Sequence, residues 1–139
     1  MTETSMNKPP VWFWIVSGIA LIWNGLGVDG YLGQAYNTER YRSAFSAEEL
    51  EMAANLPSWI TAAFAIAVFA GVIGAIGLLL RKKWATIFWI ISLIAVIIQM
   101  GYGFINKQVT HLWMTIMILV FAFLFLWFSR KSQAKGWLL

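Results

Sequence analysis

The chain contains, from Pro57 to Leu80, the stretch PSWITAAFAIAVFAGVIGAIGLLL, which decides the fold. It carries no charged residue and is longer than the roughly 20 apolar residues that a helix needs to cross a bilayer. Small residues recur along it every four positions or beside that register: Ala63, Ala67, Gly71, Gly74 and Ala75. In lipid, such a smooth groove lets another helix backbone approach closely. We therefore predict a spanning helix over 57–80, whose partner helix comes from the same chain or from a second subunit.

Three further apolar runs satisfy the same criterion: 11–33, 84–105 and 109–129. The connections between the last three spans are very short, which makes these spans antiparallel neighbours. The predicted fold class is an all-α integral membrane protein, an antiparallel bundle of four transmembrane helices. A cleaved signal peptide is the alternative for the first run, because Gly33 and Ala35 are small at the positions that a signal peptidase inspects. That run, however, exceeds the usual signal core of about 7 to 15 residues.

Composition excludes a water-soluble domain and several kinds of chemistry. Hydrophobic residues make up 60% of the 139 residues and charged residues 12%, which leaves too little polar surface for a soluble fold. The chain has no cysteine and one histidine, so disulfides and thiol catalysis are excluded and we expect no metal site. The sequence shows no glycine-rich phosphate loop and no paired carboxylates within a span, so we expect no cofactor and no enzymatic activity.

The connection between the first and second spans is the one with room for structure. Ser46 is followed three residues later by Glu49, which is the spacing of a capping box at the start of a helix. Acidic residues in that first turn complement the positive end of the helix dipole. We predict a short amphipathic helix over 46–55, with its apolar side chains on the membrane surface.

Basic residues are distributed unevenly between the two ends of the spans. Seven fall on one side: Lys8, Arg81, Lys82, Lys83, Arg130, Lys131 and Lys135. Three fall on the other side: Arg40, Arg42 and Lys107. Because Lys and Arg are retained in the cytoplasm, we expect 1–10 to be a flexible cytoplasmic tail, 131–139 a second cytoplasmic tail, and 46–55 to lie outside. The net charge of +4 then reflects topology and contact with anionic lipid headgroups, and no basic stripe indicates a nucleic-acid partner.

Polar side chains fall at matching depths in different spans. At about 1.5 Å per residue, Asn24, Gln99 and Thr115 lie roughly 20 to 22 Å from the cytoplasmic ends of their helices. A second layer, at roughly 27 to 28 Å, contains Asp29, Tyr102, His111 and Thr61. These residues are either hydrogen-bonded between helices or line an outward-facing pocket, together with Trp23, that binds a small polar molecule.

Asp29 and His111 form a possible pair across the outer layer. Each lies at the helix end whose dipole disfavours its charged form, so a contact between them would relieve both. A histidine that titrates near neutral pH would also permit proton coupling. The alternatives are that both side chains reach water and headgroups separately, or that they form a purely structural pair.

A set of short motifs resembles a known family. They are Lys8-Pro-Pro-Val-Trp-Phe-Trp14, Leu21-Ile-Trp-Asn-Gly-Leu-Gly27, Tyr31-Leu-Gly-Gln-Ala-Tyr36, the start of the second span, Leu78-Leu-Leu-Arg-Lys-Lys-Trp-Ala85 and Gln99-Met-Gly-Tyr102. Over about residues 8–105 the chain resembles a family of small bacterial inner-membrane proteins that are loosely labelled as sugar transporters. The resemblance implies a four-helix protein of the bacterial inner membrane and carries over no binding residues.

Of three classes of function, the sequence favours two, and an enzyme is the least expected. The polar layers and the family label favour a transporter or binding protein for a small polar solute such as a sugar. The small-residue groove and the short loops favour an accessory or assembly subunit of a larger membrane complex. Four spans are few for alternating access, so transport would require a homo-oligomer or a larger assembly.

Overall fold

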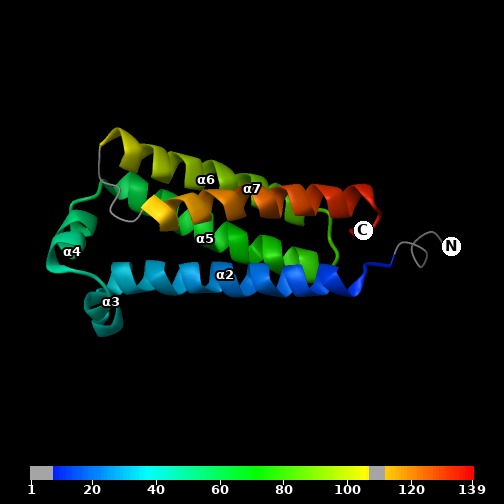
Figure 1. Cartoon of the computed structure of the whole chain (residues 1–139), viewed down its shortest axis with the longest axis horizontal. Helices are drawn as coiled ribbons and strands as arrows, with labels where there is room; N and C mark the ends of the chain where they lie inside the picture. The colour runs from blue at the N-terminus through cyan, green and yellow to red at the C-terminus, as the bar shows by residue number, and fades with distance from the viewer. Residues whose placement is uncertain (1–7, 107–111) are drawn as a thin grey trace.

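The computed structural model describes residues 8–106 and 112–139. Within these ranges the helices are α2 (Val11–Tyr36), α3 (Glu39–Ala44), α4 (Ala47–Ala54), α5 (Ser58–Leu79), α6 (Ala85–Ile105) and α7 (Leu112–Ala134). The four long helices run lengthwise in alternating directions, and α3 and α4 lie together at one end of the bundle (Figure 1). Each long helix is long and apolar enough to span a membrane. The protein is therefore an all-α, four-helix membrane bundle.

The ends of two long helices differ from the predicted spans. α2 continues beyond residue 33 to Tyr36, where Asn37 adopts a left-handed conformation (φ 53°, ψ 51°) and its N–H donates to the Gly33 carbonyl. α7 continues beyond residue 129 to Ala134, because the backbone hydrogen bonds of its polar last turn extend the helix past the apolar run. The predicted start of that span, at 109, lies outside the described residues.

The loop between α2 and α5 contains two helices, of which the sequence predicted one. α4 occupies Ala47–Ala54 within the predicted 46–55, and both capping-box bonds form, with Ser46 Oγ accepting from the Glu49 N–H and Glu49 Oε1 accepting from the Ser46 N–H, each at 3.1 Å. α3 was not predicted. Its first turn is capped by the Thr38 hydroxyl oxygen, which accepts from the Tyr41 N–H at 3.2 Å.

The small residues of α5 place this helix at the centre, packed against both α2 and α6. Gly71 faces the amide of Asn24 on α2, which occupies the space that a side chain at 71 would need. Gly74 faces Trp89 on α6, whose ring lies 2.9 Å from the position of a methyl group at 74. The Ser92 hydroxyl of α6 donates to the Ala67 carbonyl at 2.7 Å. The predicted groove is thus filled within the chain, on its two sides, by α2 and α6.

Residues 131–139 do not form the predicted tail. Residues 131–134 belong to α7, and residues 135–139 fold back on the bundle. Gly136 (φ 76°) allows the chain to turn after α7, and Trp137 and Leu138 are buried. The Arg81 guanidinium Nε donates to the Trp137 carbonyl at 2.8 Å. The Leu139 N–H donates to the Arg81 carbonyl at 2.7 Å, and its own carbonyl accepts from Lys83 at 3.2 Å. These contacts join the end of the chain to the turn between α5 and α6.

Candidate functional site

The candidate site is a cleft between α2 and α7, at the centre of the bundle. α6 packs against α7, and α5 packs against α2, whereas α2 and α7 meet through aromatic side chains. Near the basic end, where residues 135–139 lie, Phe13 packs against Phe128 in a tilted arrangement with ring centroids 5.6 Å apart. Halfway along, Trp23 meets Phe121 edge-on at 4.6 Å. Two adjacent cavities lie between the helices from this level towards α3 and α4.

The first cavity, here called the deep lobe, has a volume of about 390 Å³. This volume lies within the range of small-molecule pockets. All four long helices contribute side chains, which are mostly aromatic or aliphatic. The larger ones are Trp23, Leu26, Phe64, Val68, Trp89, Val96, Met100, Met114, Ile118 and Phe125, and the polar ones are Asn24, Ser92 and Gln99.

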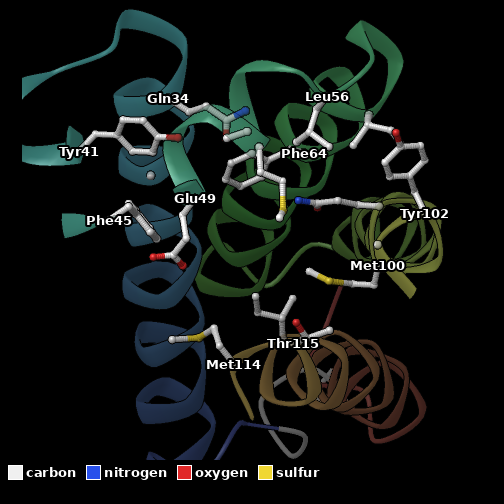
Figure 2. A pocket seen from close by; sticks show the side chains of 17 residues that line it. Gln34, Tyr41, Phe45, Glu49, Leu56, Phe64, Met100, Tyr102, Met114 and Thr115 are labelled. Carbon is white, nitrogen blue, oxygen red and sulfur yellow. The ribbon is translucent and has the colours of Figure 1, made fainter. Parts of the chain in front are cut away.

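The second cavity, here called the outer lobe, has a volume of about 350 Å³ and lies under α3 and α4. Figure 2 shows side chains from the loop helices and from α2, α5, α6 and α7 arranged around it. Its polar members are Gln34, Tyr41, Glu49, Gln99, Tyr102 and Thr115. Its lining is therefore richer in hydrogen-bonding groups than that of the deep lobe.

The two lobes are adjacent, since they share part of their lining, and together they are called the cleft. The shared residues are Gly30, Phe64, Gln99, Met100, Met114 and Ile118. An added methyl group at Gly30 would make an ordinary van der Waals contact with Phe64 Cζ at 3.9 Å.

Two polar groups of the deep lobe are engaged inside the chain, whereas the buried Trp89 indole N–H has no hydrogen-bond partner among the described residues. The Asn24 side-chain amide donates to the Ala20 carbonyl at 2.9 Å, one turn back on its own helix. The Ser92 hydroxyl is occupied by its bond to Ala67. Gln99 is half-buried and also lines the outer lobe. The deep lobe thus presents a largely apolar surface despite its polar residues.

Five of the seven predicted site residues line this cleft. Trp23 and Asn24 belong to the deep lobe, Tyr102 and Thr115 to the outer lobe, and Gln99 to both. Asn24, Gln99 and Thr115, which were predicted to lie at matching depths, therefore line two adjacent lobes.

Asp29 does not line either lobe, and its partner is on α3. Its carboxylate forms a salt bridge with Arg40, and both side chains are exposed, at 50% and 77%. Asp29 lines a third hollow with Thr38 and Arg40, and this hollow shares Gly30, Tyr41 and Phe45 with the outer lobe. His111 lies outside the described residues, so a pair between Asp29 and His111 stays a prediction, and it would have to form beside the bond to Arg40.

The sequence did not identify the loop residues of the outer lobe. Tyr41, Phe45 and Glu49 reach it because α3 and α4 fold over the bundle. Gly33 allows this approach, since a methyl group there would lie 2.9 Å from Tyr41 Cβ. Burial raises the pKa of the Tyr41 phenol above its usual 10.0. The capping box predicted α4 itself but not the side on which it packs.

The cleft offers hydrogen bonds, aromatic faces and thioethers, which is a chemistry suited to binding. Among residues 8–106 and 112–139, no group of His, Cys, Asp or Glu has the geometry to hold a metal ion. Comparisons of this chain with protein-family models, with curated proteins and with solved structures find no match. The resemblance to the inner-membrane family labelled as sugar transporters therefore remains an expectation, and the function must be argued from the cleft.

Proposed function

We propose that this protein is a multi-pass protein of the bacterial inner membrane that binds a small polar solute, such as a sugar, as a transporter or solute-binding protein. The observation that carries the proposal is the outer lobe. Its amides, hydroxyls and carboxylate come from five different helices and surround a volume of about 350 Å³. Hydroxyl-rich solutes are recognised by such sets of fixed donors and acceptors beside aromatic rings.

The charge distribution supports an orientation in which the outer lobe faces away from the cytoplasm. One end of the bundle is basic. It carries Lys8, the turn at 81–83, the last turn of α7 and residues 135–139. The loop helices lie at the opposite end (Figure 1). With the basic end in the cytoplasm, both termini are cytoplasmic and the outer lobe receives solutes from outside.

Solute binding to the purified protein in lipid nanodiscs tests the proposal. A panel of radiolabelled sugars and polyols should include a ligand that binds, and Gln99→Leu or Tyr102→Phe should weaken its binding. Gln133→Leu is the matched control for Gln99→Leu, since Gln133 is exposed at the basic end and outside the cleft. Absence of binding across the panel, or equal loss in the Gln133→Leu control, would count against solute binding in this cleft.

The alternative function is an accessory subunit of a larger membrane complex. The groove of α5 no longer supports it, because α2 and α6 fill that groove. A different surface does: α7 carries a shallow apolar hollow on its outer face, lined by Ile116, Leu119, Val120, Phe123, Leu124 and Trp127. Homo-oligomerisation or attachment to a larger complex would use this face. Native mass spectrometry of membranes extracted in mild detergent distinguishes a self-assembly from a mixed complex.

A further inference from the structure

We propose that the protein opens between α2 and α7 at the basic end of the bundle, and that residues 135–139 close this second access to the deep lobe. We call it the inner opening. The inference rests on the proposed function, since it gives a solute bound in the cleft an exit towards the cytoplasm. It follows from the buried polar groups at this end, from the aromatic contact between the two helices, and from the way residues 135–139 cover that contact.

Buried polar groups without a partner extend from the deep lobe to the basic end. Among the residues that the structure describes, four buried side-chain atoms have no hydrogen-bond partner: Ser17 Oγ, Arg81 Nη2, Trp89 Nε1 and Ser132 Oγ. Trp89 lines the deep lobe, and the Arg81 Nε bonds to the Trp137 carbonyl at the basic end. Burying a polar group without a partner costs free energy, and most such groups in proteins are paired. Water entering between the helices would supply these partners.

The two serines lie on opposite sides of the aromatic contact between Phe13 and Phe128. Ser17 follows Phe13 by about one turn of α2, in the direction of the deep lobe. Ser132 follows Phe128 by about one turn of α7, in the direction of the basic end, because the two helices run in opposite directions (Figure 1). Both hydroxyls are fully buried. Separation of the two rings would therefore join the polar groups on both sides into one path.

The contact between α2 and α7 is the one in the bundle that is suited to opening. α5 packs closely against α2 at Gly71 and against α6 at Gly74, and α6 packs against α7. α2 and α7 instead meet through aromatic rings, at Phe13 with Phe128 and at Trp23 with Phe121. Rotation of side chains and a small tilt of one helix separate such a contact without disrupting the close packing around α5.

Residues 135–139 cover this contact from the basic side. The Trp137 ring packs edge-on against Phe13, with ring centroids 5.8 Å apart. Two hydrogen bonds join the segment to Arg81, from the Arg81 Nε to the Trp137 carbonyl at 2.8 Å and from the Leu139 N–H to the Arg81 carbonyl at 2.7 Å. A short segment outside the helices can be displaced while the long helices stay folded. Residues 135–139 thus have the position and the size of a gate.

Single cysteines test the inner opening, because the chain has no cysteine of its own. Ser17→Cys places a thiol in the proposed path, and Ala85→Cys places one at an equally buried position between α5 and α6, beside Gly77. The whole chain in its membrane is treated with methanethiosulfonate ethylsulfonate, an anionic reagent that does not dissolve in lipid. Mass spectrometry measures the labelling rate, relative to the rate after unfolding. We expect Ser17→Cys to react about tenfold faster than Ala85→Cys, and equal rates would overturn the proposal.

The side from which Ser17→Cys reacts distinguishes the inner opening from the outer lobe. The reagent is added in parallel to spheroplasts and to inverted membrane vesicles. Lys131→Cys, at an exposed position in the last turn of α7, reports the side of the membrane on which the basic end lies. We expect Ser17→Cys to react from the same side as Lys131→Cys. Reaction from the opposite side alone would mean that the reagent arrived through the outer lobe, which would contradict the inner opening.

Trp137→Ala tests whether residues 135–139 are the gate. Its loss should raise the labelling rate of Ser17→Cys about tenfold and leave Ala85→Cys slow. Trp113→Ala, at a tryptophan that is 74% exposed, is the control and should change neither rate. Trp137→Phe is the second variant if Trp137→Ala unfolds the basic end and accelerates both thiols; it should accelerate Ser17→Cys alone. Unchanged labelling of Ser17→Cys, or equal acceleration of both thiols in Trp137→Phe, contradicts the gate.

Solute binding separates this inference from the proposed function. If a sugar or polyol of the panel binds while Ser17→Cys stays as unreactive as Ala85→Cys, the cleft binds a solute and the inner opening is wrong. If Ser17→Cys reacts from the basic side while no compound of the panel binds, the inner opening exists and the proposed solute binding is wrong. If neither result is obtained, both proposals fail.

Discussion

Asp29 near the end of α2 forms a salt bridge with Arg40 in α3. The contact is one of several that hold α3 against the outer end of α2, where Tyr41 lies against Gly33 and Thr38 caps α3. Because Tyr41 also lines the outer lobe, the docking of α3 determines the shape of that lobe. The salt bridge therefore acts on the cleft through the position of α3, without lining the cleft itself.

Breaking this salt bridge should have a small effect on stability. Both side chains are at least half exposed, and exposed ion pairs contribute about 0.2 to 1 kcal/mol. A double-mutant cycle of Asp29→Asn and Arg40→Gln, measured by thermal unfolding in detergent at low salt, should give a coupling energy in this range that shrinks as salt is added. A coupling well above about 1 kcal/mol would show that the pair is screened from solvent and more important than its exposure indicates.

Gly71→Leu should destabilise the bundle, because Asn24 of α2 occupies the space beside this glycine. Inserting a side chain into packed helices costs about 1 to 3 kcal/mol, and more where backbone must move. Gly101→Leu is the matched control, since an added methyl group at 101 has no atom within 4 Å. Unfolding in a titration with sodium dodecyl sulfate, followed by circular dichroism, measures the difference between the two variants. Equal stabilities would mean that α2 is not held against α5 at this point.

The bundle itself could be predicted from the sequence because its determinants are local. The length and hydropathy of each run decide whether it spans a membrane, and the spacing of Ser46 and Glu49 decides where α4 starts. The depths of Asn24 and Gln99 were also predictable, since a helix rises by a fixed distance per residue. Both residues line the deep lobe.

The direction in which a side chain points around its helix was not predictable from depth. Asp29 follows Asn24 by five residues, which corresponds to a rotation of about 140°. Asn24 consequently faces α5, while Asp29 is exposed beside α3. The packing of α3, α4 and residues 135–139 also escaped prediction, because it depends on contacts between distant residues such as Tyr41 with Gly33 and Trp137 with Phe13.

Trp137→Ala should loosen the basic end of the bundle. The Trp137 ring packs against Trp12 and Phe13, with centroid distances of 5.3 and 5.8 Å, and its carbonyl accepts from Arg81. Removing a buried tryptophan side chain costs on the order of 3 to 5 kcal/mol. Trp113→Ala, at a tryptophan that is 74% exposed, is the control and should cost much less. Chemical unfolding of both variants in the same detergent checks this, and similar losses would mean that residues 135–139 do not stabilise the bundle.

Alkaline pH should weaken the docking of α3 through Tyr41. Burial raises the pKa of the Tyr41 phenol above 10.0, so above that pH the folded state retains a proton that the undocked state releases. The contribution of the partly buried phenol is therefore complete below about pH 10 and decreases as the pH rises through the folded-state pKa. Thermal unfolding between about pH 8 and about pH 11 should show this loss, and Tyr41→Phe should reduce it. Tyr36→Phe removes a hydroxyl from a ring that is 77% exposed and serves as the control. If the Tyr41→Phe variant loses stability with pH as steeply as the unmodified protein does, the pKa of Tyr41 is not what weakens the docking of α3.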